Sequence, residues 1–340
     1  MARHKNIPFF IPHSGCKNNC VFCSQTKITG FSLPTDGIMA ESARLAATVD
    51  EALEYMDGAE AQIGFFGGSF TGIERERMLS LLSTAYAYVK AGKVSGIRLS
   101  TRPDYISGEI LDILQSYGVT DIELGLQSTN EAVLKAAGRG HSRQVCFDSA
   151  GMIVERGFGF GGQMMIGLPM SDYEKDLQTA RDIVSMGANA VRIYPTVVFS
   201  GTALYDMVQR GEYSPISNER AVEIAADCLR IFKEAGVEVL RIGLHASEEL
   251  KNAPYGANHP SMGELVYARL AYGEVTKLLA GKDTEGKSLR LYVPAKSVSA
   301  VAGYRGENKE KLKQSYLLKS VKIYKSDRAE GIGYSLETED

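Results

Sequence analysis

The residues best suited to do chemistry are three cysteines near the start of the chain, Cys16, Cys20 and Cys23. Their spacing is C-x3-C-x2-C, and Phe22 stands directly before the third cysteine. Iron–sulfur clusters are held by cysteine thiolates, commonly four for a cubane. Three closely spaced thiolates would therefore hold one face of such a cluster and leave one iron free to bind another molecule.

Two other interpretations of the cysteines are open. A zinc site could use the three thiolates with His13 as the fourth ligand, but structural zinc usually takes a second, distant ligand pair, and the sequence has none. Cys146 and Cys228 each lie alone in a helix-like stretch. A disulfide framework is disfavoured, because 5 cysteines in 340 residues are an odd and sparse set. The spacing favours iron–sulfur over zinc.

The string C-x3-C-x-aromatic-C resembles the cluster loop of radical S-adenosylmethionine (SAM) enzymes. The resemblance implies a [4Fe–4S] cluster on Cys16, Cys20 and Cys23, with SAM chelating the unique iron. It also implies that an electron from the cluster cleaves SAM to a 5′-deoxyadenosyl radical, and that Phe22 contacts the adenine. A donor such as flavodoxin or ferredoxin is expected to supply that electron.

Alternating short apolar runs and longer amphipathic stretches before residue 240 indicate βα units and a parallel sheet. Strands are expected over 8–11, 61–66, 96–100, 121–126, 160–166 and 190–194, and helices over 40–55, 74–90, 108–116, 143–155, 173–186 and 218–233. These βα units predict an α/β fold, a partial (β/α)6 TIM-like barrel over residues 1–240. In such barrels the active sites gather at the C-terminal ends of the strands, and the cysteine loop follows the first strand.

Further candidate residues follow the predicted strands. Gly67 and Gly68 form a turn after the second strand, where paired glycines let the backbone approach a ligand. Gln127 ends the fourth strand, and Arg139 follows 12 residues later, where it could pair with a carboxylate. By resemblance, the glycine turn contacts the amino group of SAM, and these residues complete the SAM site together with Ser100 and Gln163.

The strings Gly-Leu-Gln-Ser at 125–128 and Ile-Gly-Leu-Pro at 166–169 resemble the branch that holds the Elongator catalytic subunit and the oxygen-independent coproporphyrinogen oxidases. Those oxidases have aspartate where Gln163 stands and glutamate where Ser100 stands. The segment 192–205 also resembles the segment that follows the sixth strand in the Elongator subunit. The resemblance covers about residues 5–240, so we expect no acetyltransferase domain.

The sequence changes character after residue 240. We expect an irregular and helical covering segment over 241–280 and a small α+β module over 281–340. Residues 282–328 hold 12 Lys or Arg and 5 Asp or Glu, a net charge of +7, whereas the whole chain carries −3. A strand over 289–293, a helix over 295–302, a helix over 308–316 and a strand over 320–324 would give a KH-like β-α-GxxG-α-β core, in which the GxxG loop clamps backbone nucleotides.

The residues expected to grip RNA are those of the GxxG loop and two lysines beyond it, namely Gly303, Tyr304, Arg305, Gly306, Lys309 and Lys313. The other interpretation is a simple turn between helices with a solvated basic face. Modification of transfer RNA or other RNA is the favoured function, and a small-molecule radical enzyme related to the coproporphyrinogen oxidases is the alternative.

The bulk composition sets the remaining limits. Apolar residues make up 44% and charged residues 23% of the chain, which is ordinary for a globular protein. No apolar run approaches the roughly 18 residues of a membrane span, and the run 7–11 is too short for a signal-peptide core. A cytoplasmic enzyme without a membrane partner is expected, in a compartment that keeps thiols reduced.

Overall fold

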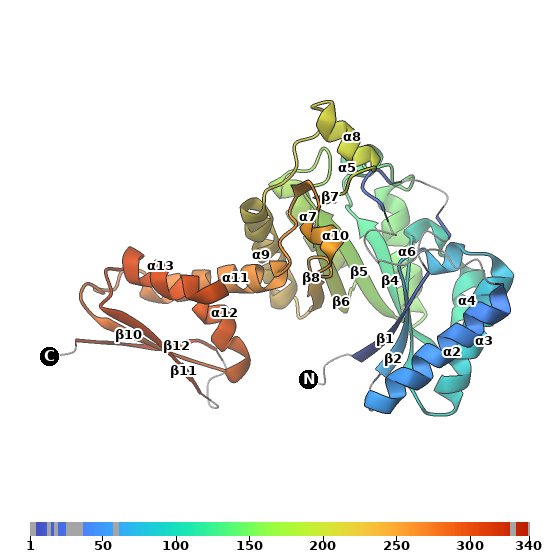
Figure 1. Cartoon of the computed structure of the whole chain (residues 1–340), viewed down its shortest axis with the longest axis horizontal. Coiled ribbons are helices and arrows are strands. Elements are labelled where there is room, and N and C mark those ends of the chain that lie inside the picture. The colour runs from blue at the N-terminus through green and yellow to red at the C-terminus, as the bar shows by residue number, and fades with distance from the viewer. Residues whose placement is uncertain are drawn as a thin grey trace.

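The protein is described by a computed structural model that covers residues 5–11, 15–16, 20–24, 37–56, 61–326 and 331–338. His13 lies outside these residues. The larger part is built on a 7-stranded sheet, and a smaller part at the C-terminal end holds a 3-stranded sheet (Figure 1). The fold is α/β, a partial TIM-like barrel with a small α+β module, as the sequence predicts.

Every neighbouring pair of strands in the large sheet is parallel, in the order β1-β2-β3-β4-β5-β6-β8. The strands are β1 (Lys5–Phe10), β2 (Ala61–Phe66), β3 (Gly96–Thr101), β4 (Val119–Gln127), β5 (Gly159–Ile166), β6 (Ala190–Pro195) and β8 (Glu238–Ile242). Parallel strands are covered by helices, so they appear in the sequence as nearly continuous apolar runs. All carboxyl ends of these strands therefore meet at one edge of the sheet.

The helices of the barrel are α2 (Ile38–Tyr55), α3 (Arg75–Lys90), α4 (Gly108–Ser116), α5 (Glu131–Ala136), α6 (Arg143–Glu155), α7 (Tyr173–Ser185), α8 (Ala203–Gln209) and α9 (Asn218–Glu234). Figure 1 shows α2 and α3 beside β1 and β2, and α7 and α9 at the other end of the sheet. Several begin at a residue whose side chain accepts a hydrogen bond from the first turn: Ser107, Asn130, Ser142, Asp172, Thr202 and Ser217. These N-caps fix where the helices start.

The sheet has one strand more than the expected six. β8 pairs with β6, and residue 240, the expected boundary of the barrel, falls inside β8. This strand lies at the edge of the sheet, and most of its side chains are exposed or half-buried. Its sequence therefore lacks the continuous apolar run that marks the central strands.

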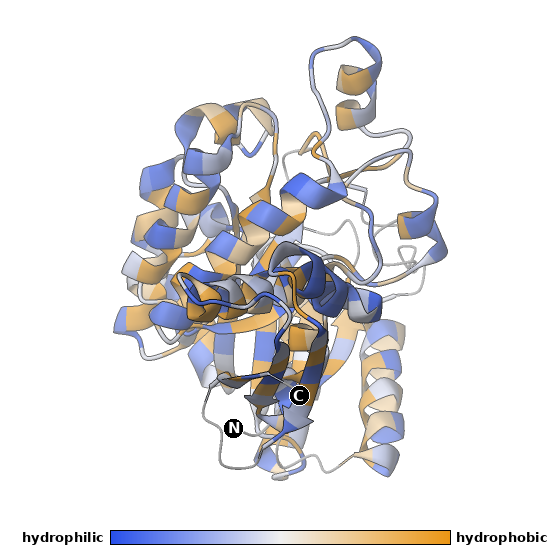
Figure 2. Ribbon diagram, turned by 90° about the vertical axis from the view of Figure 1, so that its left-hand side faces the viewer, coloured by the Kyte–Doolittle hydropathy of each residue, from blue (hydrophilic) through white to orange (hydrophobic). Residues whose placement is uncertain are grey.

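Beyond β8 come α10 (Glu248–Lys251), the short strand β9 (Tyr255–Gly256), which pairs with β7 (Val197–Val198), and the long helix α11 (Met262–Leu279). α11 belongs to two hydrophobic cores. Its first half packs Val266 into the core of the barrel, and its second half packs Val275 into the core of the C-terminal module. Figure 2 shows helices with hydrophobic and hydrophilic residues on different sides, as such packing requires.

The C-terminal module contains β10 (Ser288–Val293), α12 (Val298–Ala302), α13 (Glu307–Ser315), β11 (Ser320–Lys325) and β12 (Gly333–Glu337). β10 is central, parallel to β11 and antiparallel to β12. Figure 1 shows α11, α12 and α13 on one side of this sheet. β12 has no counterpart in the sequence-based expectation, because its short polar sequence follows the last strong strand pattern.

Within the described residues, every helix is too short or too polar to span a lipid bilayer.

Candidate active site at the carboxyl edge of the sheet

The cysteine loop leaves the carboxyl end of β1. Cys16 is exposed, whereas Cys20 and Cys23 are half-buried in a turn in which the Cys23 amide donates to the Cys20 carbonyl over 3.0 Å. In the described part of the chain, no group of three His, Cys, Asp or Glu side chains converges closely enough to hold a metal ion. Residues 12–14 and 17–19 of this loop lie outside that part. The assignment of the cluster to the three cysteines stays a prediction.

The loop packs directly on the glycine turn that follows β2. Gly15 has φ +80°, and a side chain on it would lie 2.2 Å from the Ser69 carbonyl oxygen, so only glycine fits. The Cys16 Sγ lies 3.3 Å from the Ser69 Oγ. Gly67 also has a left-handed backbone, with φ 96°. The structure thus brings the predicted cysteine loop and the predicted Gly67-Gly68 turn together.

Two buried guanidinium groups point at the sulfur of Cys20. Arg139 Nη1 donates to the Cys20 Sγ over 3.1 Å, and Arg102 Nη1 lies 3.8 Å from the same atom. Arg102 also binds both carboxylate oxygens of Asp104 and donates to the Arg139 carbonyl. The two contacts hold the Cys20 sulfur in position and place positive charge beside it. Arg102 is a site residue that the sequence analysis missed, although it directly follows β3.

In the structure, Arg139 donates hydrogen bonds to a sulfur and to a backbone carbonyl, while its predicted pairing with a carboxylate stays a prediction. Its Nη2 donates to the carbonyl oxygen of Gly125, while Nη1 reaches Cys20. A side chain at Gly125 would lie 3.1 Å from the Gln127 amide nitrogen and 3.6 Å from the Arg139 guanidinium. Glycine at 125 therefore lets both predicted residues gather at the same strand end.

Gln127 has an unusual backbone conformation. Its φ is 67°, a left-handed value that costs energy in a residue other than glycine. Its Oε1 atom is buried and has no hydrogen-bond partner among the described residues. A buried acceptor of this kind normally has a partner. An orphaned acceptor at the strand end that also holds the Arg139 guanidinium fits a bound cofactor that donates a hydrogen bond, such as the amino group of SAM.

Ser100 and Gln163, the other predicted SAM residues, contact each other deeper in the barrel. Gln163 Nε2 donates to Ser100 Oγ over 2.9 Å and to Glu123 Oε2 over 2.8 Å. Glu123 also binds Arg192 at 2.6 Å and Arg98 at 3.3 Å. Burial alone would raise the pKa of Glu123, but the two guanidinium groups outweigh it and lower that pKa. The inner face of the sheet is therefore polar and charged.

The carboxyl ends of β6 and β8 add positive charge to this interior. Arg241 Nη1 lies 3.1 Å from His245 Nε2, and no acidic side chain in the described part of the chain pairs with Arg241. Burial lowers the pKa of Arg241 and, together with the Arg241 charge, that of His245. Burial also raises the pKa of Tyr194 nearby. Arg241 and His245 are placed where they could bind an anionic group of a substrate.

The Phe22 ring does not lie open to a ligand. It is 9% exposed and packs in an apolar cluster with Leu168, Val198 and Leu204. Val21 anchors the same turn, because its amide donates to the Ala137 carbonyl over 3.1 Å and its carbonyl accepts from Leu204. The predicted contact of Phe22 with adenine would therefore come from the backbone, and the ring fixes the loop on the barrel.

The predicted RNA-binding loop lies between the two helices of the C-terminal module. Gly303 has φ 81° and ψ 164°, a backbone open only to glycine, and a side chain on it would lie 2.6 Å from the Asn308 amide. Gly306 has φ 83° and open space around it. The ring of Tyr304 packs edge-on against His259 at 5.2 Å. Arg305 and Lys313 are exposed, and Lys309 is half-buried.

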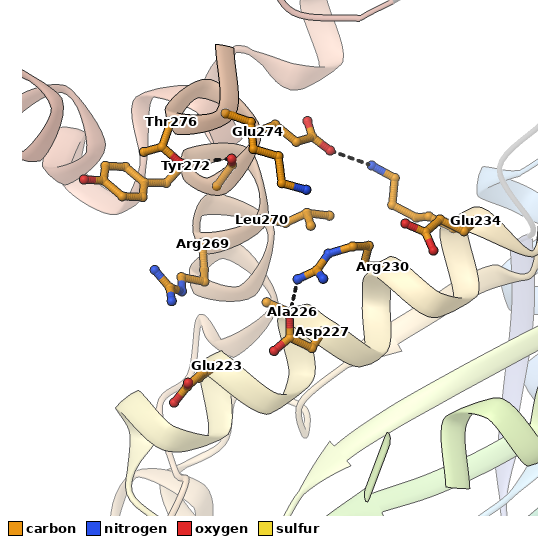
Figure 3. Close-up of a pocket in the computed structure, with 13 residues that line it drawn as sticks. Glu223, Ala226, Asp227, Arg230, Glu234, Arg269, Leu270, Tyr272, Glu274 and Thr276 are labelled. Atoms are coloured by element: carbon orange, nitrogen blue, oxygen red, sulfur yellow. Dashed lines mark hydrogen bonds and ion pairs between the residues drawn. The ribbon is translucent and has the colours of Figure 1, made fainter. Parts of the chain in front are cut away.

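Figure 3 shows a groove of about 540 Å³ between α9 and α11, away from the cysteine loop. Its charges are balanced and largely paired with each other, as in the Lys233–Glu274 pair at 3.8 Å. Both helices belong to the outer layer, so the groove takes no part in the site at the strand ends.

We expect Arg139→Leu to lower the cluster content and the rate of SAM cleavage by about 10- to 100-fold, the usual effect of losing a residue that orients a metal ligand. The substitution removes the hydrogen bond that Arg139 donates to the Cys20 sulfur and the one that it donates to the Gly125 carbonyl. Iron content and 5′-deoxyadenosine formation would measure the effect. Arg181→Leu, at an exposed pair with Glu174, is the matched control, and equal losses in both variants would contradict the role of Arg139.

Comparisons with known proteins show the family of this chain. A family model described as "Radical SAM superfamily" matches residues 10–183, and a "Radical_SAM C-terminal domain" model matches residues 188–272. The tRNA uridine(34) acetyltransferase of Methanocaldococcus infernus is 30% identical over 177 residues, which are 50% of this chain and 32% of that protein. Human Elongator complex protein 3 is 30% identical over 181 residues, 52% of this chain and 32% of that protein.

The chain thus spans about a third of the length of these curated relatives. A solved structure of the M. infernus Elp3 with an N-terminal deletion aligns with a TM-score of 0.62 and 22% identity, covering 82% of this chain and 64% of that chain. The likeness to this structure supports the fold. Because the superfamily model alone spans half of the sequence, the chain belongs to the radical SAM superfamily and is an enzyme that uses a [4Fe–4S] cluster and SAM.

Proposed function

We propose that this enzyme modifies RNA, with transfer RNA as the first candidate. The observation that carries the proposal is the GxxG loop of Gly303–Gly306, set in a basic module that α11 joins to the barrel. The loop leads directly into α13, which begins at Glu307 and has Gly306 at its N-cap position, so no side chain caps its first turn. Free backbone amides at a helix start attract phosphate, and Lys309 and Lys313 lie on that helix.

The module is held to the barrel side of the molecule by specific contacts. Tyr304 of the loop packs on His259, which precedes α11, and Asn308 Nδ2 donates to the Ala268 carbonyl of α11 over 2.8 Å. An RNA strand bound at the loop would therefore be held at a defined place relative to the barrel. The matched region of the relatives, whose names specify tRNA uridine acetylation and Elongator, supports transfer RNA as the substrate class.

In the proposed site, Cys16, Cys20 and Cys23 hold the cluster. When bound, the cluster and SAM would supply the radical chemistry that removes a hydrogen atom from the substrate. Arg139 and Arg102 would hold the Cys20 sulfur in position, and Ser69 would orient Cys16. Flavodoxin or ferredoxin is the proposed electron donor, in the reducing cytoplasm.

Other residues would position SAM and the substrate. Gln127 Oε1 would accept a hydrogen bond from the SAM amino group, and the Gly67-Gly68 turn would offer backbone groups to the same end. Ser100 and Gln163, which are hydrogen-bonded to each other, would contact the ribose. Arg241, with His245, would receive a phosphate or another anionic group of the RNA, because it has no acidic partner in the described residues.

The proposal is tested with anaerobically reconstituted protein, dithionite, SAM and total transfer RNA. We expect the RNA to raise 5′-deoxyadenosine formation and a nucleoside of altered mass to appear after digestion of the RNA. Protein with Cys16, Cys20 and Cys23 all replaced by alanine is the negative control. If 5′-deoxyadenosine forms equally with nuclease-digested RNA and no nucleoside changes, RNA is not the substrate. Turnover of coproporphyrinogen III in its place would assign the enzyme to small-molecule chemistry.

Reversing charge at the loop is expected to weaken RNA binding. Arg305→Asp combined with Lys309→Asp should raise the Kd for transfer RNA by about 10-fold or more at roughly 0.1 M salt and reduce the salt dependence of binding, because phosphate contacts release counterions. Filter binding at several salt concentrations would measure both. The control is Lys90→Asp with Lys251→Asp, which changes the charge equally outside the module. An equal loss in the control would show that only net charge matters.

A further inference from the structure

The C-terminal sheet leaves one face without covering helices. Side chains alternate between the two faces of a strand, and in β10 the residues Leu289, Leu291 and Val293 are fully buried in the module core. Tyr292, between them in the sequence, points to the other face and is 36% exposed, and Tyr324 of β11 is 40% exposed. Large exposed aromatic rings at this face call for an explanation.

The two tyrosines form one stacked pair. Tyr292 and Tyr324 are register partners on the parallel strands β10 and β11. Their ring centroids lie 5.6 Å apart, with an angle of 21° between the ring planes. Such aromatic pairs are stabilised beyond what their buried area contributes. The two rings therefore lie together as one unit, in which each ring keeps one face free of the other.

The free side of this pair is open. On the strand β12, the residue opposite Tyr292 is Gly333. A side chain on Gly333 would make ordinary van der Waals contact with Tyr292, at 3.7 Å from its Cβ. Because glycine offers no such side chain, the ring of Tyr292 has Tyr324 on one side and no side chain from the directly opposite residue of β12 on the other.

Basic residues lie next to the tyrosines on the same face. Arg290 and Lys322 are also register partners, two residues before Tyr292 and Tyr324. Lys322 is exposed and forms no ion pair with any residue that the structure describes. Arg290 pairs with Glu337 at 2.8 Å through one nitrogen, while its buried Nε has no hydrogen-bond partner in the described part of the chain. The face thus carries an aromatic pair and an adjacent cationic pair.

We propose that this face, made of Tyr292, Tyr324, Arg290 and Lys322, binds unpaired RNA bases by stacking, with the two cations on the neighbouring phosphates. Stacking on aromatic side chains beside positive charge is the usual way in which proteins hold single-stranded nucleic acid. The face is distinct from the GxxG loop, which joins the two helices on the covered side of the sheet.

This inference rests on the proposed function, because it assumes an RNA substrate. It adds that the enzyme requires an unpaired segment, such as a loop, next to the nucleotide backbone that the GxxG loop holds. A substrate that is fully paired would leave the tyrosine face empty.

The experiment compares the full chain with Tyr292→Val plus Tyr324→Val and with Tyr292→Phe plus Tyr324→Phe. Valine keeps the strand preference and removes the ring, and phenylalanine keeps the ring. The probe is a labelled RNA of about 12 nucleotides, within the site size of such surfaces, used single-stranded and as a perfect duplex. We expect the valine variant to bind the single strand about 10-fold or more weakly, the phenylalanine variant to bind normally, and duplex binding to be unchanged.

Tyr55→Ala is the matched control, because Tyr55 is 83% exposed on α2, far along the chain from the module. Circular dichroism would check that each variant is folded. A second readout is tyrosine fluorescence, which no tryptophan masks in this chain; RNA should quench it less in the valine variant.

The outcomes separate the two proposals. If the unaltered chain binds the single strand and the valine variant binds it equally well, the inference is wrong and the proposed function stands. If the unaltered chain binds neither single strand nor duplex, the RNA function itself fails. An equal loss for both probes in the valine variant would overturn base stacking.

Discussion

Replacing Glu123 with glutamine is expected to cost about 3–5 kcal/mol of folding free energy, the usual effect of breaking a buried ion pair. Glu123 is 1% exposed and receives hydrogen bonds from Arg192 at 2.6 and 3.1 Å. Arg98, itself 2% exposed, adds a contact of 3.3 Å. The substitution keeps the shape of the side chain but removes the carboxylate that Arg192 pairs with, whereas the buried Arg98 keeps its pair with Asp121 at 2.9 Å. Since a domain is stable by only about 5–15 kcal/mol, much of the stability would be lost.

Urea unfolding followed by circular dichroism would measure this loss. Glu109→Gln is the matched control, because it is the same chemical change at a 72% exposed carboxylate that pairs with Arg75. Exposed pairs contribute about 1 kcal/mol or less. Equal losses of unfolding free energy in the two variants would mean that the Glu123 charge does not stabilise the buried arginines.

The pH dependence of stability has a definite sign. The folded-state pKa of Glu123 lies below its ordinary value of 4.5. Its stabilising contribution is therefore present above pH 4.5 and is lost as the pH falls through the lower folded-state value. The glutamine variant lacks this titration, so the stability difference from the unaltered chain should shrink in acid.

The elements of the barrel could be predicted because their strands are buried on both faces. Helix α4 and helix α6 have the bounds that the sequence indicates, since Ser107 and Ser142 cap their first turns. The edge strand β8 was missed for the opposite reason, because only its last residue, Ile242, is buried. A strand that is not buried on both faces lacks the continuous apolar run by which strands are recognised in the sequence.

The site was only partly predictable. The cysteine spacing and the paired glycines are local, so the sequence alone indicates them. Arg98 and Arg192 could not be found in this way, because a charged residue in a strand is normally solvated, and their partner Glu123 lies 25 and 69 residues away. The left-handed backbone of Gln127 is also invisible in the sequence, because it depends on the shift in register between β4 and β5.

The charged side chains inside the barrel differ in whether a charge of opposite sign lies beside them. Glu123 neutralises one part of the positive charge from Arg98 and Arg192, whereas Arg241 keeps its charge without an acidic partner in the described residues. A buried charge without a partner is costly. Arg241 is half-buried, so it bears part of this cost, and a bound anion such as an RNA phosphate would offset that part.

The second large effect is expected at Cys20. Replacing Cys20 with alanine should reduce 5′-deoxyadenosine formation more than about 100-fold, because losing a ligand costs more than losing the residue that orients it. Of the two half-buried loop cysteines, Cys20 is the one whose sulfur receives contacts from both Arg139 and Arg102. Iron and sulfide analysis after anaerobic reconstitution, together with 5′-deoxyadenosine measurement, would show the change.

The matched control is Cys146→Ala, which removes a sulfur that is fully buried in α6. Burial raises the pKa of the Cys146 thiol to about 12, so this sulfur stays protonated and does not ligate metal. We expect the control to keep its iron, although it loses some stability from the small cavity. If Cys146→Ala lost the cluster and Cys20→Ala kept it, the cluster would not lie on the cysteine loop. If neither lost it, Cys20 would not be a ligand.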